Sequence, residues 1–391
     1  MKRIAVFGGS FDPVHTEHIR FARKAIEQLN LDKLFVMPAA APPHKPGKIL
    51  SLDGDRLAMC RLAFENEPKA EVCDYEIARG GTSYTYLTCR HFRETYPSSE
   101  IYWLVGTDML RDFPTWKEPL SILKDVTLAV CARAEENGWL ERERAAFKAK
   151  FETDFTVVDY NGLDVSSTKI RVTAGAGGNV AEYVGEKVAE YIKARGLYEI
   201  PGASAALALE KPSRKAHTLR VAETAAKKAV EMRLSERKAI AAALFHDCAK
   251  NLGADSPYLD GFVCKEEWGE VPPPVLHQFT GAYVAERAFG VTDGEILDAI
   301  RYHTSGKPNM TELGKLVFLA DMVEYGREFE GVEKLRSLFW AKKGVGALDE
   351  CLIAALEQTL SHVREKGEKT YPLTLRAYEY YRREIYDENN E

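Results

Sequence analysis

The chain has 391 residues, 45% of them hydrophobic, and a formal net charge of −6 at pH 7. This length favours two domains over one, because single domains usually span about 100–200 residues. The composition is that of an ordinary globular protein with a hydrophobic core. A slightly acidic chain shows no sign of a nucleic-acid-binding surface, although it leaves room for a local basic pocket that holds phosphate.

The seven cysteines are scattered without a C-x-x-C pair, which is typical of reduced thiols and not of a disulfide framework. The apolar run that follows Lys2 and Arg3 is too short for a signal peptide. No apolar run approaches the roughly 18–20 residues that a membrane helix needs. We therefore expect a cytoplasmic protein that binds neither nucleic acid nor membrane, and the oligomeric state, a homo-oligomer included, stays open.

Apolar, strand-like runs alternate with helical patterns up to about residue 198. The first run, residues 3–9, precedes an amphipathic helix that Asn30 is expected to end. The apolar face of this helix consists of Ile19, Ala22, Ile26 and Leu29. Further strands are predicted at residues 33–39, 101–108, 126–132 and 155–160, with a helix over 86–96. Such alternation predicts a Rossmann-like α/β fold, a doubly wound parallel sheet that binds ligands at the carboxyl ends of its strands.

Strand patterns nearly vanish from about residue 215. Helical spacing is found instead in the segments 217–232, 236–250, 280–290, 311–326 and 349–363. Between the two regions, residues 198–215 contain two prolines, a glycine and many small residues, which is typical of a linker. We predict an α/β domain over residues 1–200, a linker over 201–212 and an all-α domain over 213–391.

Two glycines and two histidines lie where the first strand meets the first helix, in VFGGSFDPVHTEH, residues 6–18. Glycine lets the backbone approach a ligand closely and adopt φ > 0, so the N–H groups of Gly8 and Gly9 can face phosphate oxygens. The helix that begins there adds free N–H groups and the positive end of its dipole. His15 and His18 add imidazole donors that can hold a phosphate or balance charge on a leaving pyrophosphate. The pattern predicts a nucleotide-phosphate site that is neither a dinucleotide-binding G-x-G-x-x-G nor a P-loop.

A second string, DVSSTKIR over residues 164–171, has the chemistry to complete that site. Its hydroxyl groups can cap a helix and donate to phosphate, and its two cationic side chains add further donors. These residues are Ser166, Ser167, Thr168, Lys169 and Arg171.

The two strings together resemble the nucleotidyltransferase superfamily, which is marked by an H-x-x-H element and an I-S-S-T-x-I-R motif. The intervening strings are similar to those of bacterial nicotinate-nucleotide adenylyltransferases, the NadD family, collinearly from residue 3 to about 198. They are PAAAPPHK (38–45), SYTYLT (83–88), LVGTDMLRDFPTWKEP (104–119) and VCAR (130–133). The resemblance implies that ATP, with Mg²⁺, and nicotinate mononucleotide react in line to give deamido-NAD and pyrophosphate.

The family's residue roles carry over onto the matching positions of this sequence. The resemblance implies catalytic roles for His15, His18 and Arg171. It implies ATP binding by Gly8, Gly9, Ser10, Phe11, His15, His18, Ser166, Ser167, Thr168 and Arg171. It implies mononucleotide binding by Lys45, Thr85, Asp108, Trp116 and Arg133. The indole of Trp116 suits stacking on a pyridine ring, with core packing as the alternative. The sequence departs from the family at Glu17, where glycine is common, and we expect that carboxylate to point outward.

Four histidines and two aspartates of the helical region favour a metal site. Adjacent residues on a helix point about 100° apart, so His246 and Asp247 share a metal only when other helices deliver the remaining ligands. Two nitrogen and two oxygen ligands completed by water suit iron, manganese or another borderline divalent ion. A second ion, bridged by Asp247, would let the pair activate water and clamp a phosphate. The predicted ligands are His217, His246, Asp247 and Asp321 for the first ion, and Asp247, His277 and His303 for the second.

The H…HD…D spacing resembles the HD phosphohydrolase superfamily. KAHTLRVAETA, ALFHDCAK and VLHQFTGAYVAE are similar to the YqeK family, over about residues 213–385. That family is credited with symmetrical cleavage of diadenosine tetraphosphate to two ADP at a di-iron-type centre. The resemblance implies catalytic roles for Asp247 and Lys250, and candidate phosphate contacts at Lys250 and Arg301, for which an exposed place on a helix is the alternative. Tyr325 stands where the family commonly has proline.

We therefore expect a bifunctional enzyme whose ligands are ATP, nicotinate mononucleotide and diadenosine tetraphosphate. The N-terminal domain has an alternative as a sibling transferase that uses nicotinamide mononucleotide, phosphopantetheine or a cytidylyl donor. The helical domain has an alternative as a non-catalytic module that senses nucleotides or metal. Iron is the expected metal of the helical domain, in a dinuclear centre, with manganese as the alternative.

Overall fold

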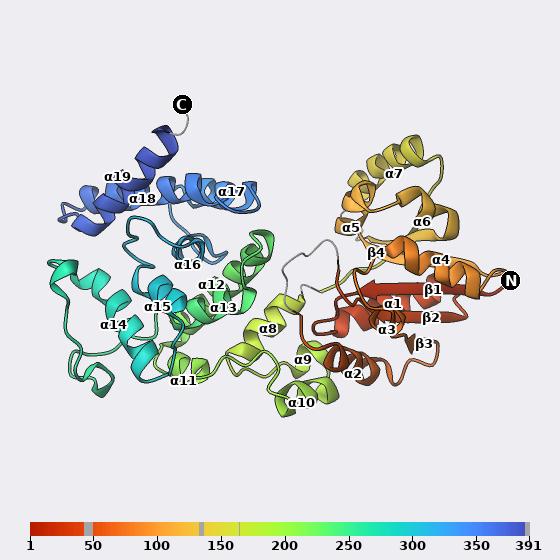
Figure 1. Cartoon of the computed structure of the whole chain (residues 1–391), viewed down its shortest axis with the longest axis horizontal. Helices are drawn as coiled ribbons and strands as arrows, with labels where there is room; N and C mark the ends of the chain where they lie inside the picture. Colours follow the sequence, from red (N-terminus) through yellow and green to blue (C-terminus); the bar gives the residue numbers. More distant parts are fainter. Residues whose placement is uncertain (43–49, 133–136, 164, 388–391) are drawn as a thin grey trace. The chain divides into compact units, whose positions relative to one another are not determined.

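The computed structural model describes residues 1–42, 50–132, 137–163 and 165–387, and Figure 1 shows its elements. Contacts within the chain separate these residues into two compact units. The first unit comprises the described residues up to Ile170 together with Asn179–Leu197. The second comprises Arg171–Gly178 and the described residues from Tyr198 onward.

The first unit contains a six-stranded sheet in which every pair of neighbouring strands is parallel. The strand order is β3-β2-β1-β4-β5-β6, so the chain reverses direction across the sheet between β1 and β4. This crossing point is where doubly wound folds bind their ligands. The predicted α/β fold is confirmed. The strands are β1 (Arg3–Gly9), β2 (Lys33–Pro38), β3 (Ala70–Val72), β4 (Glu100–Gly106), β5 (Thr127–Ala132) and β6 (Thr156–Asp159).

The central strands form because both of their faces are covered, which requires continuous apolar runs rather than alternation. Val6 of β1 packs in a cluster with Phe92, Ile122 and Phe147 from three helices on one face of the sheet. The next residue, Phe7, points to the opposite face and contacts Phe21 at a ring-centroid distance of 5.1 Å. The described helices of this unit are α1 (Thr16–Gln28), α2 (Asp53–Phe64), α3 (Tyr75–Arg79), α4 (Thr85–Thr95), α5 (Thr107–Asp112), η1 (Phe113–Thr115), α6 (Pro119–Asp125), α7 (Asn137–Phe151), α9 (Ala181–Val184) and α10 (Glu186–Ala194).

Helix α1 buries a slightly different face from the predicted one. Phe21, Ala22 and Ala25 are its buried apolar residues, whereas Ile19 and Ile26 are half-buried. The predicted apolar face omitted Phe21, whose ring packs against Phe7 of the sheet. The predicted stop at Asn30 is confirmed, because Asn30 has φ 50° immediately after the last helical turn, a left-handed conformation that asparagine tolerates.

The second unit is helical. Small side chains on α12 and α13 let the two backbones pack closely, and fully buried alanines on both helices belong to one large core. Its helices are α11 (Ala203–Ala208), α12 (Pro212–Glu231), α13 (Glu236–Phe245), η3 (Pro257–Leu259), η4 (Glu266–Trp268), α14 (Pro273–Arg287), α15 (Gly294–Arg301), α16 (Glu312–Val323), α17 (Val332–Ala341), α18 (Asp349–Glu365) and α19 (Pro372–Asp387). Among the described residues, none of the helices in either unit combines the length and the apolar character that crossing a bilayer would require.

The segment expected to be a linker differs from that expectation. Residues 201–212 include the short helix α11, and its Ala203, Ala206 and Leu207 are buried in the helical core. The small residues that indicated a linker are therefore packed in part. Helix α8 (Ser167–Gly175) spans the division between the units, and its Val172 belongs to the same helical core.

Candidate active sites

Gly8 and Gly9 end β1 at the centre of the sheet. A Cβ atom on Gly8 would lie 3.0 Å from Cζ2 of Trp103, and one on Gly9 would lie 3.1 Å from the ring of Phe11. Neither glycine has a positive φ, whereas Phe11 has φ 46°. The expectation that these glycines adopt φ > 0 is therefore wrong. Glycine is needed at both positions because the rings of Trp103 and Phe11 leave no room for a Cβ atom.

His15 and His18 lie against each other at the start of α1, where His15 is the residue before the first helical position. Their rings are stacked with centroids 3.6 Å apart. The backbone N–H of His15 donates to Nδ1 of His18 at 3.1 Å, so the ring proton of neutral His18 is on Nε2. Burial lowers the pKa of His15 to about 4, although the carboxylate of Glu17 opposes that shift. The Nδ1 atom of His15 is buried and lacks a hydrogen-bonding partner among the described residues.

Glu17 does not point outward, and that expectation is corrected. The residue is buried, and Arg20 Nη1 donates to its Oε1 at 2.9 Å. Its Oε2 accepts hydrogen bonds from the Tyr160 hydroxyl and from the backbone N–H of Leu163. These three donors compensate the desolvation of the carboxylate, which is why an acidic side chain is tolerated inside the fold.

The second string predicted to bind phosphate leads into the first turn of α8. The backbone N–H of Lys169 donates to Ser166 Oγ at 3.2 Å, so Ser166 caps the helix as the sequence indicates. Ser167 Oγ donates to the backbone carbonyl of Pro13 at 3.0 Å. The two strings that are far apart in sequence therefore meet, and the half-buried Thr168 lies in the same first turn.

Arg171, the last residue of that string, belongs to the second unit. Its side chain is almost fully buried and forms an ion pair with Glu236 in the first turn of α13. The predicted contact of Arg171 with ATP is not tested by this arrangement and stays a prediction.

The candidate mononucleotide residues are only partly within the described chain. Thr85 starts α4 and is half-buried. Asp108 is exposed in the first turn of α5, and its Oδ1 would lie 2.6 Å from a Cβ on Gly106, the last residue of β4. Trp116 is buried against Phe113 at 5.3 Å, in line with the core-packing alternative. Lys45 and Arg133 lie outside the described residues.

Arg56 is a positioning residue that the sequence did not reveal. Its side chain is completely buried, and its guanidinium donates to the backbone carbonyls of Ser10 at 2.8 Å and Ser51 at 3.2 Å. The arginine therefore holds the loop that follows Gly9. An arginine within a helical pattern ordinarily faces solvent, so its spacing carried no signal.

The predicted metal ligands of the second unit converge from five helical segments. His217 lies on α12, and His246 and Asp247 follow the last turn of α13 rather than lying within it. His277 lies on α14, His303 follows α15, and Asp321 lies on α16. All of these side chains except that of Asp321 are buried. Groups of their nitrogen and oxygen atoms lie within 4.8 Å of one another, a separation suited to holding a metal ion.

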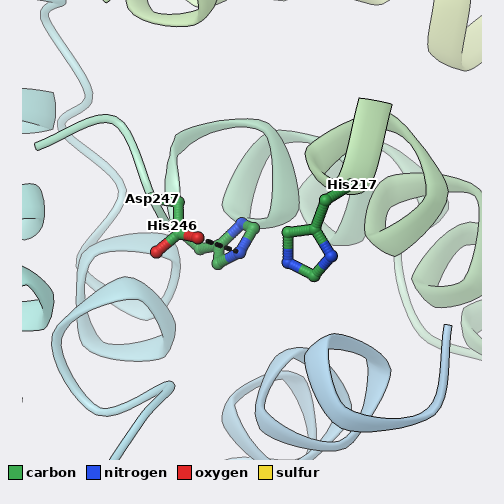
Figure 2. A group of neighbouring side chains, drawn as sticks. All are labelled: His217, His246 and Asp247. Atoms are coloured by element: carbon green, nitrogen blue, oxygen red, sulfur yellow. Dashed lines mark ion pairs between the residues drawn. The ribbon is translucent and has the colours of Figure 1, made fainter. Parts of the chain in front are cut away.

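One group is formed around His217 and His246. Nε2 of His217 lies 2.8 Å from Asp321 Oδ1, and Nε2 of His246 lies 3.9 Å from the same oxygen. Asp247 Oδ2 lies 3.4 Å from Nε2 of His246. Figure 2 shows the two imidazole rings facing a common space, with the Asp247 carboxylate beside His246.

The second group uses the other oxygen of the same aspartate. Asp247 Oδ1 lies 3.3 Å from Nε2 of His277 and 3.6 Å from Nε2 of His303, and these two nitrogens are 3.1 Å apart. Two nitrogens each about 2.1 Å from one ion, at right angles, are about 3.0 Å apart. Asp247 therefore faces one group with each oxygen, as a bridging carboxylate does.

The three best-buried histidines are oriented in the same way. Nδ1 of His246 lies 2.6 Å from the carbonyl of Ala243, and Nδ1 of His303 lies 2.7 Å from the carbonyl of Ile300. Nδ1 of His217 lies 3.0 Å from Oε1 of Glu324. Each acceptor fixes the proton on Nδ1, which leaves the Nε2 lone pair as the ligand atom.

These residues fit a divalent metal. Nε2 of His246 and Oδ1 of Asp247 are buried without a hydrogen-bonding partner in the described part of the chain, which is costly unless an ion takes that role. Burial alone would raise the pKa of Asp247, but the adjacent His246, His277 and His303 hold it well below its ordinary value. The carboxylate is thus ionised and ready to ligate.

Cationic side chains lie beside the ligands, and of these the sequence singled out Lys250 but neither Arg214 nor Arg327. Arg214 Nη1 donates to Asp247 Oδ2 at 2.9 Å, and Arg327 forms an ion pair with Asp321. Lys250 Nζ lies 3.3 Å from Nε2 of His277 and 3.4 Å from Asp247 Oδ1, so it is part of the cluster rather than surface decoration. The only sequence signal for Arg214 is its position one helical turn before His217.

Two family models match the chain. A cytidylyltransferase-like model covers residues 6–173, and an HD-domain model covers residues 214–326. Together with the parallel sheet and the histidine–aspartate cluster, they define a nucleotidyltransferase domain followed by an HD domain, a domain type that binds divalent metal.

Similar proteins narrow this class. A protein of Mycoplasma genitalium named as a probable nicotinate-nucleotide adenylyltransferase/Ap4A hydrolase is 32% identical over 84% of this chain and 89% of its own. One of Clostridium tetani named as a probable nicotinate-nucleotide adenylyltransferase is 37% identical over 51% of this chain and 100% of its own. A crystal structure of a predicted HD superfamily hydrolase involved in NAD metabolism, from Clostridium acetobutylicum, is 31% identical over 46% of this chain and 94% of its own, with a TM-score of 0.40. The chain belongs to the nicotinate-nucleotide adenylyltransferase family, in the form that carries a C-terminal HD domain.

Proposed function

We propose that the first unit transfers AMP from MgATP to nicotinate mononucleotide and releases deamido-NAD and pyrophosphate. The observation that carries this proposal is the meeting of the two phosphate-binding strings, where Ser167 Oγ bonds to the Pro13 carbonyl beside the stacked His15 and His18. The names of the relatives from Clostridium tetani and Mycoplasma genitalium support it.

The reaction asks the chain to position two substrates and to offset charge. A phosphate oxygen of the mononucleotide attacks the α-phosphorus of ATP, and the bond from that phosphorus to the pyrophosphate oxygen breaks. His18 would donate its Nε2–H to the departing phosphates, beside the free N–H groups at the start of α1. Because its pKa is about 4, His15 is neutral at pH 7 and would act through hydrogen bonds rather than charge.

We further propose that the second unit hydrolyses diadenosine tetraphosphate symmetrically to two ADP. The six predicted ligands would hold two divalent ions, iron or alternatively manganese, with Asp247 shared between them. A bound divalent metal supplies Lewis acidity, which makes water a better nucleophile and offsets phosphate charge. Lys250 would neutralise a phosphate oxygen from its place beside His277. The seven cysteines are thiols rather than disulfides in the described structure, which supports a cytoplasmic location.

Product assays on the full-length protein test both activities. We expect His18→Ala to abolish AMP transfer and keep hydrolysis, and Asp247→Asn to do the reverse. His362→Ala, at an exposed position on α18, is the control and should keep both. A faster reaction with nicotinamide mononucleotide would favour the sibling transferase. Tight binding of diadenosine tetraphosphate without release of ADP, in the presence of Fe²⁺ or Mn²⁺, would favour a sensor.

A further inference from the structure

The carboxylate of Glu17 joins the H-x-x-H helix to the segment that leads into α8. Its Oε2 accepts from the Tyr160 hydroxyl at 2.5 Å and from the Leu163 backbone N–H at 2.7 Å. Its Oε1 accepts from Arg20, which compensates the negative charge on the outer side of the helix. A carboxylate at this position of a phosphate site would ordinarily repel ATP, but here its oxygens are turned away and occupied by donors.

The surrounding chain is shaped to receive this side chain. A Cβ on Gly162 would lie 2.9 Å from Glu17 Oε2 and 2.8 Å from the Tyr160 ring, so only glycine lets residues 160–163 wrap around the carboxylate. The other end of α1 is fastened to the same strand end. Gln28 donates to the backbone carbonyl of Asp159 at 2.9 Å and accepts from its N–H at 3.0 Å.

The geometry points to Glu17 as a positioning residue for AMP transfer, an inference that rests on the proposed transferase function. By holding residues 160–163 against the first turn of α1, Glu17 sets where the first turn of α8 begins. That turn carries Ser166, Ser167 and Thr168, which are predicted to bind the phosphates of ATP. The bond from Ser167 to Pro13 closes the same arrangement from the other side. A displacement of about 1 Å at such donors is enough to cost up to about a hundredfold in rate.

Two substitutions at the same position separate the hydrogen bonds from the charge. Glu17→Ala removes the acceptor of both tethering bonds, and we expect kcat/KM for ATP to fall about tenfold or more while KM for the mononucleotide stays within about twofold. Glu17→Gln retains an acceptor oxygen for Tyr160 and Leu163 and should restore activity to within about threefold of wild type. Glu27→Gln is the matched control, since Glu27 is exposed on the same helix and pairs with Lys24.

A second measurement does not depend on turnover. Hydrogen exchange at the Leu163 amide of the full-length protein should accelerate about tenfold or more in the Glu17→Ala variant and stay unchanged in Glu27→Gln. Unchanged exchange together with an unchanged kcat/KM for ATP in Glu17→Ala would overturn the inference. An equal rise in KM for both substrates would also overturn the inference, because such a rise indicates general disruption of the site. If wild-type protein transfers no AMP, the proposed function fails, while the exchange result still decides whether the tether exists.

Discussion

Substituting Glu324 by glutamine should weaken metal binding in the HD domain. Glu324 is 1% exposed and lies against Nδ1 of His217, and it also accepts from Arg220 Nε at 2.6 Å and from the Gly326 N–H at 2.6 Å. Burial alone would raise its pKa, but these partners lower the pKa to about 2, so the carboxylate is charged at pH 7. A charged partner fixes the tautomer of a ligand histidine and raises its basicity.

The expected magnitude follows from that role. Loss of a carboxylate that orients a metal-ligating histidine usually lowers metal affinity by about 10–100-fold, which is about 1.4–2.7 kcal/mol. Glutamine keeps the shape and leaves an oxygen for His217, so we expect the lower half of that range. Arg220 is partly exposed and can turn to water, so the fold should tolerate the change.

Titration of metal-depleted, full-length protein with Mn²⁺ against a competing chelator measures the effect. Glu333→Gln is the control, because Glu333 is exposed and pairs only with nearby Arg336 in the described structure. Hydrolysis of diadenosine tetraphosphate by Glu324→Gln should recover at high Mn²⁺. An unchanged affinity in Glu324→Gln, or an equal loss in the control, would refute the reasoning that Glu324 orients His217.

Three further predictions concern other residues. The pKa of His15 is lowered to about 4 in the folded state, so the unfolded state takes up the proton first and the free energy of unfolding falls as pH drops below about 6.5. Denaturant unfolding should show that this free energy decreases by about 2 kcal/mol between pH 7 and pH 5. The His15→Gln variant should not show that decrease. Gly8→Ala places a Cβ atom 3.0 Å from Trp103 and should lower the free energy of unfolding by about 1–3 kcal/mol, measured by thermal melts. An unchanged melting temperature would show that the indole moves aside at no cost. Lys250→Met should lower kcat for hydrolysis about tenfold or more with metal content unchanged, and loss of metal instead would mean that Lys250 supports the ligands.

The sheet could be predicted because parallel strands with both faces covered need continuous apolar runs, and such runs are visible in a single sequence. The strand β3 (Ala70–Val72) was missed because three residues carry no pattern. The histidine–aspartate cluster could be predicted because buried ionisable residues in apolar helices have few other reasons to be there. That Asp247 bridges two ions stays a prediction, although each of its oxygens faces a different group of histidines.

The missed features all depend on contacts between distant parts of the chain. Nothing near Arg56 indicates that its guanidinium is buried beneath the Ser10 carbonyl. Nothing near Glu17 indicates that Tyr160 and Leu163 satisfy its carboxylate. Gly8 was expected for its freedom of φ, but a neighbouring strand's indole is what excludes a side chain there. Such partners are set by the assembled fold, and local spacing does not carry them.

The division of α8 between the two units affects where the chain can be cut to make separate domain fragments. The helical unit uses residues 171–178 before the chain returns to the α/β unit for residues 179–197. A hydrolase fragment cut at residue 213 would leave behind Val172 and Ala203, which are buried in its core with Ile240. Such a fragment would expose apolar core surface to water and would tend to aggregate. A chimera in which the HD domain is joined to another transferase domain should therefore include residues 171–178 with the HD domain.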